Sequence, residues 1–225
     1  MEKMTKLEEL KHGKLVGVIR GARPNQIIPI ARALKEGGIR TLEITVETPK
    51  VCHLIEKVKE EFGDDIIAGA GTVLDPETAR AVIMAGAEFI FSPTVNVKTI
   101  KLAKRNGVIS IPGALTPTEI LTAYEHGADI IKVFPADALG VSYFKNLKGP
   151  LPHIPLMPTG GVNLDNLASF FKAGAIAAGV GGSLINPAKL ITGEDYTRLT
   201  ETAKKILGYR TKRLKPSIAY MNIFH

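Results

Sequence analysis

The sequence predicts an α/β fold: a single (β/α)8 TIM barrel with an N-terminal helix and a basic C-terminal extension. The first observation is a recurring unit of amphipathic segment, glycine and short β-branched run, as in ARALKEGGIRTLEIT, ARAVIMAGAEFIFSP and ILTAYEHGADIIKVFP. The second is the even spacing of eight apolar runs, whose centres lie 19 to 26 residues apart. Eight βα units of that size account for most of the chain and match the count of a barrel of this class.

The elements follow in order from this pattern. The charged start MEKMTKLEELKHGK predicts a helix and not a signal peptide. Because the apolar runs are continuous, they suit parallel strands buried on both faces. Glycine enters the left-handed conformation cheaply and therefore ends each helix. The helix-ending glycines are Gly38, Gly86, Gly107, Gly127 and Gly174, and the strand centres are Val18, Ile44, Ile67, Ile90, Ile109, Ile131, Met157 and Ala178.

No Ser/Gly-rich or Pro-rich linker divides the chain before about residue 208. We therefore expect one barrel over residues 1–207 and an extension over 208–225. A doubly wound open sheet is the alternative. Against it, GAGTVL lacks the third glycine of a dinucleotide-binding GxGxxG motif, and no GxxxxGK phosphate-binding loop occurs.

Composition excludes several classes of protein. With 45% hydrophobic and 23% charged residues, the chain is neither disordered nor collagen-like. Its single cysteine, Cys52, cannot form an internal disulfide, and no apolar run reaches eighteen residues, so we expect a cytoplasmic protein without a membrane span. The net charge is +7, but residues 204–225 hold six basic and no acidic residues, which leaves +1 for the rest. A nucleic-acid partner is therefore not expected.

Three charged residues stand on or at the ends of predicted strands. Lys132 interrupts the apolar strand DIIKVFP, and burial would give it the neutral amine that attacks a carbonyl. Glu43 in RTLEITV would point into the same interior, where a carboxylate can move protons. Arg20 would present a guanidinium to a carboxylate or phosphate. The structural alternatives are an ion pair between Lys132 and Glu43, and a salt bridge from Arg20 to Glu43.

Two glycine-rich segments, PTGGV at 158–162 and GVGGSL at 179–184, follow the last two predicted strands. Barrels of this class often bind phosphate there through backbone N–H groups, and Ser183 adds a hydroxyl. Tight turns without a ligand are the alternative. The five histidines are scattered and form no set with metal-ligand spacing, so no metal site is expected.

Taken together, the strand-end motifs resemble the 2-keto-3-deoxy-6-phosphogluconate (KDPG) and 4-hydroxy-2-oxoglutarate (KHG) aldolases over roughly residues 10–207. The motifs occur in the same order: EITV, GAGTV, SP, PG, KVFPA, PTGGV and GVGGSL. The resemblance implies a compact barrel, a homotrimer and an aldehyde-lyase that needs neither metal nor cofactor. It also implies Lys132 as the Schiff-base residue and Glu43 as the acid/base. The implied substrate-binding residues are Arg20, Thr72, Pro93, Phe134, Thr159, Gly160, Gly161, Gly181, Gly182 and Ser183.

The expected reaction is cleavage of KDPG to pyruvate and glyceraldehyde 3-phosphate. The alternatives are an aldolase for non-phosphorylated 4-hydroxy-2-oxoglutarate, a galactonate-series aldolase, a catalytically silent sugar-phosphate-binding barrel, or an RNA-associated protein using its basic end. One residue departs from well-known members, which carry arginine where this chain has Glu47. Glu47 must turn outward or pair with Arg20, or else the substrate differs. The apolar end of the extension is expected to pack on a subunit interface.

Overall fold

The computed structural model describes residues 2–212, with side chains described for 3–208, and alternates strands with helices along its length. The first half comprises α1 (Glu2–Gly13), β1 (Leu15–Ile19), α2 (Ile27–Glu36), β2 (Thr41–Thr45), α3 (Val51–Phe62), η1 (Gly63–Asp65), β3 (Ile67–Gly71), α4 (Pro76–Met84), β4 (Phe89–Phe91) and α5 (Val97–Arg105). The second half comprises β5 (Ile109–Ile111), β6 (Gly113–Ala114), α6 (Pro117–Glu125), β7 (Ile131–Val133), α7 (Gly140–Lys148), β8 (Leu156–Pro158), α8 (Leu167–Lys172), β9 (Ala178–Val180), η2 (Pro187–Lys189) and α9 (Gly193–Lys212).

All strand pairs are parallel, as the sequence predicts, but the hydrogen bonds divide them into two sheets. One sheet has the order β5-β4-β3-β2-β1-β9 and the other the order β6-β7-β8. The predicted single barrel sheet is therefore interrupted. Pro112, which lacks an N–H donor, separates β5 from β6. At the other junction β8 and β9 meet through an isolated parallel bridge between Thr159 and Gly179.

The predicted positions of strands and helix ends are confirmed. Each of the eight predicted strand centres lies within an observed strand. The five predicted helix-ending glycines all have positive φ, from +70° at Gly107 to +99° at Gly174. A side chain is strained in that conformation, which explains why glycine recurs at these points.

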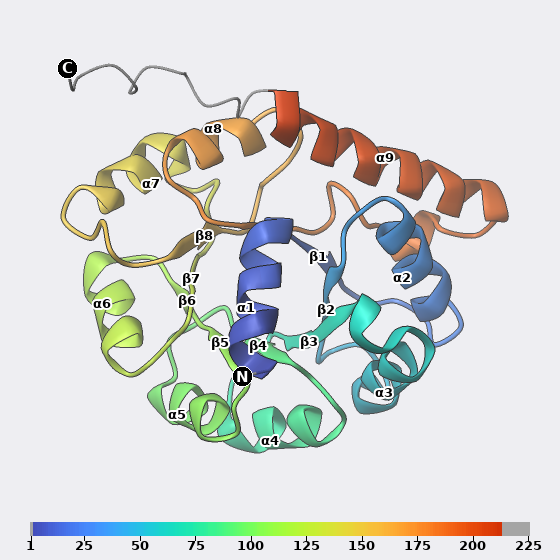
Figure 1. Ribbon diagram of the computed structural model, residues 1–225, viewed down its shortest axis with the longest axis horizontal. Helices are drawn as coiled ribbons and strands as arrows, with labels where there is room; N and C mark the ends of the chain where they lie inside the picture. Colours follow the sequence, from blue (N-terminus) through green and yellow to red (C-terminus); the bar gives the residue numbers. More distant parts are fainter. Residues whose placement is uncertain (1, 213–225) are drawn as a thin grey trace, which may run out of the picture.

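The helices α2 to α9 form a ring around the strands, and α1 lies across one end of the ring (Figure 1). Apolar residues of α1, Leu7 and Leu10, are buried with Val16, Ile67 and Phe89 in a core enclosed by the strands. A larger core fills the layer between the strands and the surrounding helices. The helix α1 therefore closes the end at which the strands begin, opposite the strand ends that carry the predicted site residues.

The last helix, α9, packs against α2. A Cβ atom at Gly37, just after α2, would lie 2.4 Å from the Cβ of Ala203, so the two helices approach closely there. The predicted boundary between residues 207 and 208 falls inside α9. The predicted packing of the extension on a subunit interface concerns residues that lie outside those described. No helix among the described residues has the length and apolar character needed to cross a membrane.

Candidate active site

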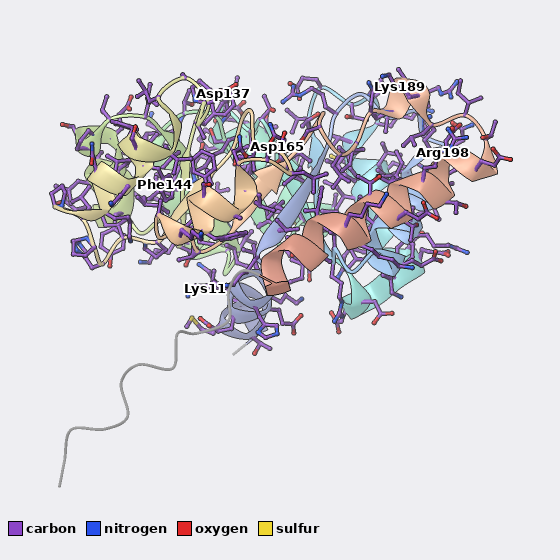
Figure 2. The ribbon with its side chains drawn as sticks, turned by 90° about the horizontal axis from the view of Figure 1, so that it is seen from above. Lys11, Asp137, Phe144, Asp165, Lys189 and Arg198 are labelled. Atoms are coloured by element: carbon purple, nitrogen blue, oxygen red, sulfur yellow. The ribbon has the colours of Figure 1, made fainter. Side chains whose placement is uncertain are left out.

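The predicted site residues gather where the strands end. Figure 2 shows Asp137 after β7, Asp165 after β8 and Lys189 after β9 at one end of the molecule, with Lys11 of α1 at the opposite end. Parallel strands share one direction, so their carboxyl ends meet on one side. Lys132, Glu43 and the glycine-rich loops therefore share this end or the interior below it.

Glu43 lies in the middle of β2 and is 1% exposed. Its side chain passes over Gly71 of β3, where a Cβ atom would fall 1.6 Å from Glu43 Oε1. The second oxygen, Oε2, is buried without a hydrogen-bond partner among the described residues. Burial raises the pKa of Glu43 to about 7; the charges of Lys132 and Arg20 lower it and that of Glu47 raises it. A carboxyl group of this kind can both give and take a proton near neutral pH.

Lys132 lies on β7 and is also buried, with 6% exposure. No carboxylate of the described residues lies within 4.0 Å of its amine, so the predicted alternative of a close ion pair with Glu43 is not what the structure holds. Its Nζ instead lies 4.4 Å from the ring centre of Phe91 and 4.5 Å from that of Phe134. Burial lowers the pKa of Lys132; the Glu43 carboxylate raises it and the Arg20 guanidinium lowers it further. The burial of the amine favours its neutral, nucleophilic form.

Arg20 directly follows β1 and is engaged by two partners. One guanidinium nitrogen donates to Glu47 Oε1, and the other donates to Thr72 Oγ1 at 3.2 Å. The structural alternative of a bridge from Arg20 to Glu43 is therefore wrong: Glu47 takes that place. Partial burial raises the pKa of Glu47, but its backbone hydrogen bond and Arg20 outweigh this and leave the pKa below its ordinary value. Glu47 therefore stays ionised and holds Arg20 at the mouth of the site.

Thr159 and Phe134 come from neighbouring strand ends. Thr159, after β8, is buried, and its Oγ1 has no hydrogen-bond partner among the described residues. It fits because Gly179 has no side chain: a Cβ there would lie 2.5 Å from Thr159 Oγ1. The Phe134 ring lies against Gly160, with a Cβ distance of 3.3 Å. Pro93 follows β4, and its carbonyl oxygen would be 2.4 Å from a Cβ at Gly113.

The two glycine-rich loops are tied together at their base. Ser183 Oγ donates to the carbonyl oxygen of Val162 at 2.7 Å. Gly160 and Gly161 both have positive φ, +89° and +67°. The open space around Gly182, where a Cβ would meet no atom within 4 Å, leaves its backbone accessible. Consecutive peptide groups in such conformations turn their N–H groups outward and make an anion-binding concavity.

The sequence alone did not single out Phe91 or Gly71. Phe91 looks like one more apolar strand residue, and only the packing shows its ring against Lys132. Gly71 had a usable signal, since a glycine inside a strand often marks a close approach of a neighbouring group. Among residues 3–208, no cluster of three or more His, Cys, Asp and Glu side chains could hold a metal ion.

Comparisons with known proteins agree with one another. Residues 7–202 match the family described as KDPG and KHG aldolase. The chain is 35% identical to a 2-dehydro-3-deoxy-phosphogluconate aldolase of Treponema pallidum, covering 91% of this chain and 97% of the relative. It is 36% identical to a 2-dehydro-3-deoxy-6-phosphogalactonate aldolase of Escherichia coli, covering 76% and 83%. Among solved structures, a Legionella pneumophila KDPG aldolase with pyruvate captured as a covalent carbinolamine has a TM-score of 0.79 at 29% identity, covering 86% and 93%.

Proposed function

This chain belongs to the KDPG and KHG aldolase family, and we propose that it cleaves a 2-keto-3-deoxy-6-phospho sugar acid to pyruvate and glyceraldehyde 3-phosphate through an imine on Lys132. One observation carries the assignment of residues. A buried lysine without a close ion-pair partner shares the site with a carboxyl group whose pKa is about 7. Such a lysine is the nucleophile, and such a carboxyl group is the acid/base, that an imine mechanism requires.

The reaction starts when the neutral amine of Lys132 adds to the C2 carbonyl of the substrate and gives a neutral carbinolamine. The Glu43 carboxyl group, with a water molecule as relay, supplies the proton with which the C2 hydroxyl leaves as water. The product is an iminium ion whose positive charge lies on Nζ. Glu43 thereby becomes the carboxylate needed for the next step.

Cleavage breaks the C3–C4 bond, and its electron pair neutralises the iminium nitrogen to give an enamine. Glu43 removes the proton of the C4 hydroxyl, so that C4 leaves as the aldehyde. Glu43 then returns that proton to C3, which regenerates the iminium. Water adds to C2, Glu43 takes the proton that is released, and pyruvate leaves the neutral amine of Lys132 with Glu43 protonated as at the start. The iminium acts as an electron sink, which explains why this chemistry needs a lysine.

We assign the substrate carboxylate to Arg20 and Thr72, and the pyruvyl pocket walls to Pro93 and Phe134. Thr159 offers an unpartnered hydroxyl to the sugar chain. The loops with Gly160, Gly161, Gly181, Gly182 and Ser183 receive the distal phosphate. The positive φ of Gly160 and Gly161 and the open space around Gly182 support that role.

The test is a borohydride trap with pyruvate, read by peptide mass spectrometry. Reduction should fix a pyruvyl group on Lys132, and Lys132→Ala should abolish both the adduct and turnover. Lys148 is the matched control, since burial also lowers its pKa but its amine donates to the carbonyls of Pro152 and Ile154. Lys148→Ala should still give the pyruvyl adduct on Lys132. An active protein that yields no adduct on Lys132 would falsify the mechanism and leave a silent or RNA-associated barrel to consider.

The phosphate preference has its own test. Ser183→Ala should lower kcat/KM for KDPG, with little effect on 4-hydroxy-2-oxoglutarate, which carries no phosphate. If both substrates respond equally, the glycine-rich loops do not select phosphate. The galactonate-series substrate belongs in the same assay, because a relative carries that activity in its name.

We propose that the two sheets act as one (β/α)8 barrel, supported by the single-residue gap at Pro112 and the bridge between Thr159 and Gly179. Residues 1–207 would form this catalytic domain and 208–225 an extension, in a cytoplasmic homotrimer as the family resemblance implies. Light scattering measures the oligomer. Deleting residues 213–225, which leaves α9 whole, should preserve kcat.

A further inference from the structure

Two phenylalanine rings enclose the amine of Lys132 from different strands. Phe91 ends β4 and is fully buried, and Phe134 directly follows β7. Their ring centres lie 4.4 Å and 4.5 Å from Nζ, within the range at which a ring face attracts a cation. Phe134 belongs to the pocket expected from the family resemblance, whereas Phe91 has no part in the mechanism given above.

The position of Phe91 is fixed by its neighbours. Its ring meets that of Phe89 edge to face, with centres 6.2 Å apart and planes at 76°. Phe89 in turn lies over Gly69, where a Cβ atom would fall 2.5 Å from the ring. Since both phenylalanines are completely buried, the Phe91 ring is held in place against Nζ.

The charge on Nζ changes during the proposed reaction, so the two rings stabilise some of the species along it more than others. The amine and the carbinolamine are neutral, the iminium is cationic, and the enamine is neutral again. The cationic nitrogen of the iminium is the same Nζ that lies against the rings. We propose that Phe91 is a positioning residue that stabilises the cationic iminium over the neutral carbinolamine through its ring face. This inference rests on the proposed function, because it requires an imine at Lys132.

Two opposite effects of Phe91 must be separated. As a quadrupole, the ring favours the charged forms of Lys132; as an apolar wall, it excludes water and disfavours them. The charged groups that act on Lys132 are Glu43 from β2, Arg20 after β1 and Glu47 after β2. A substitution at residue 91 leaves these three charges in place. A fall in the pKa of Lys132 then shows that the ring quadrupole dominates, and a rise shows that the exclusion of water dominates.

The experiment compares Phe91→Leu with Phe144→Leu, which removes a buried ring of α7 that packs edge to face on Phe170 and has no ring contact with Phe91 or Lys132 among the described residues. NMR titration of lysine labelled with ¹³C at Cε measures the pKa of Lys132 in the free enzyme. The Lys132 signal is the one that is absent in Lys132→Met. Borohydride trapping at a series of pyruvate concentrations measures the fraction of the enzyme that is present as the iminium. For Phe91→Leu we expect a lower pKa of Lys132 and about a tenfold smaller fraction trapped as iminium. Phe144→Leu should change neither the pKa of Lys132 nor the trapped fraction.

An unchanged or higher pKa of Lys132 in Phe91→Leu would overturn the proposal, because Phe91 would then act only by packing or by excluding water. If Phe91→Leu does not fold, ring-fluorinated phenylalanines at residue 91 keep the shape while weakening the ring quadrupole stepwise. The trapped fraction should then fall with each added fluorine, and a flat series overturns the proposal. Failure of the proposed function is recognised separately, since no variant would then trap pyruvate while the free-enzyme titration stays readable.

Discussion

Glu43 occupies the space that a side chain at residue 71 would need: a Cβ atom on Gly71 would lie 1.6 Å from Glu43 Oε1 and 2.5 Å from its Cγ. The missing side chain on β3 thus creates the channel through which the carboxylate of β2 reaches the site. Glycine weakens a strand interior, so its presence here has a packing reason. The orientation of Glu43, the proposed acid/base, depends on a residue without a proposed part in the chemistry.

Gly71→Ala should therefore lower kcat by about a hundredfold, because the added methyl group displaces the Glu43 carboxylate from its working position. Steady-state kinetics measures the effect, and Gly193→Ala, with no atom within 4 Å of its added Cβ, is the control. In a Glu43→Ala background the substitution at residue 71 should have no further effect on kcat. A full additional loss there would mean that Gly71 acts through some other group.

Glu43→Gln should change stability in a pH-dependent way. The folded protein keeps the Glu43 proton up to about pH 7, whereas the unfolded chain loses it near 4.5. The wild type therefore loses stability as pH rises through this window, by about 3 kcal/mol at most, while glutamine does not titrate. The variant should match the wild type below pH 4.5 and exceed it above pH 7 in chemical denaturation.

Glu119→Gln should change the pH dependence of stability in the opposite direction to Glu43→Gln. Hydrogen bonds from the Thr116 and Leu115 backbone hold the pKa of Glu119 below its ordinary value. Its stabilising contribution is present above the ordinary carboxyl pKa and disappears as pH falls through the lowered one. This variant should thus be less stable than the wild type at neutral pH. The expectation for Glu43 fails if its stability difference is constant across pH 4–8.

Glu47→Gln should strengthen binding of the substrate carboxylate. In the free enzyme Glu47 is an anion paired with Arg20, and a substrate carboxylate must compete with it for the same guanidinium. We expect a several-fold lower KM for the keto acid in Glu47→Gln and a KM at least tenfold higher in Arg20→Gln, with smaller changes in kcat. Glu47→Asp serves as the charge-conserving control. An unchanged KM in Arg20→Gln would place the carboxylate elsewhere.

Glu88 should matter for stability and not for catalysis. Its carboxylate is 10% exposed, accepts from the Ala68 N–H at 2.9 Å and pairs with Lys6 at 2.5 Å and Lys59 at 3.1 Å. Glu88→Ala leaves a buried donor unpaired near two charges, so unfolding should become easier by about 3 kcal/mol. The exposed pair Glu8–Lys11 is the control, and Glu8→Ala should cost less than 1 kcal/mol. Equal costs would show that Glu88 is no better paired than a surface residue.

Much of the fold and two residues of the candidate site could be predicted, because short sequence patterns determine them. Strand centres and helix ends follow from apolar runs and from glycines that must adopt positive φ, and these were confirmed residue by residue. Lys132 and Glu43 stood out because a charge inside an apolar strand needs a reason. The interruption of the sheet at Pro112 was not predicted, because the even spacing of eight apolar runs indicated one continuous sheet. Proline has no N–H to donate, so the sequence did contain a signal for it.

By itself, the sequence determined the order of strands and helices, and it predicted a site at the strand ends with two charged residues, Lys132 and Glu43, at its centre. Only the tertiary structure decided which partner each charge takes: Glu47 and Thr72 for Arg20, two aromatic rings for Lys132, and the space over Gly71 for Glu43. The physical reason is that composition and periodicity act over a few residues. Apart from Phe134, which lies next to β7 in the sequence, these partners are 27 to 52 residues apart in the chain and are brought together only when the sheets curve and pack.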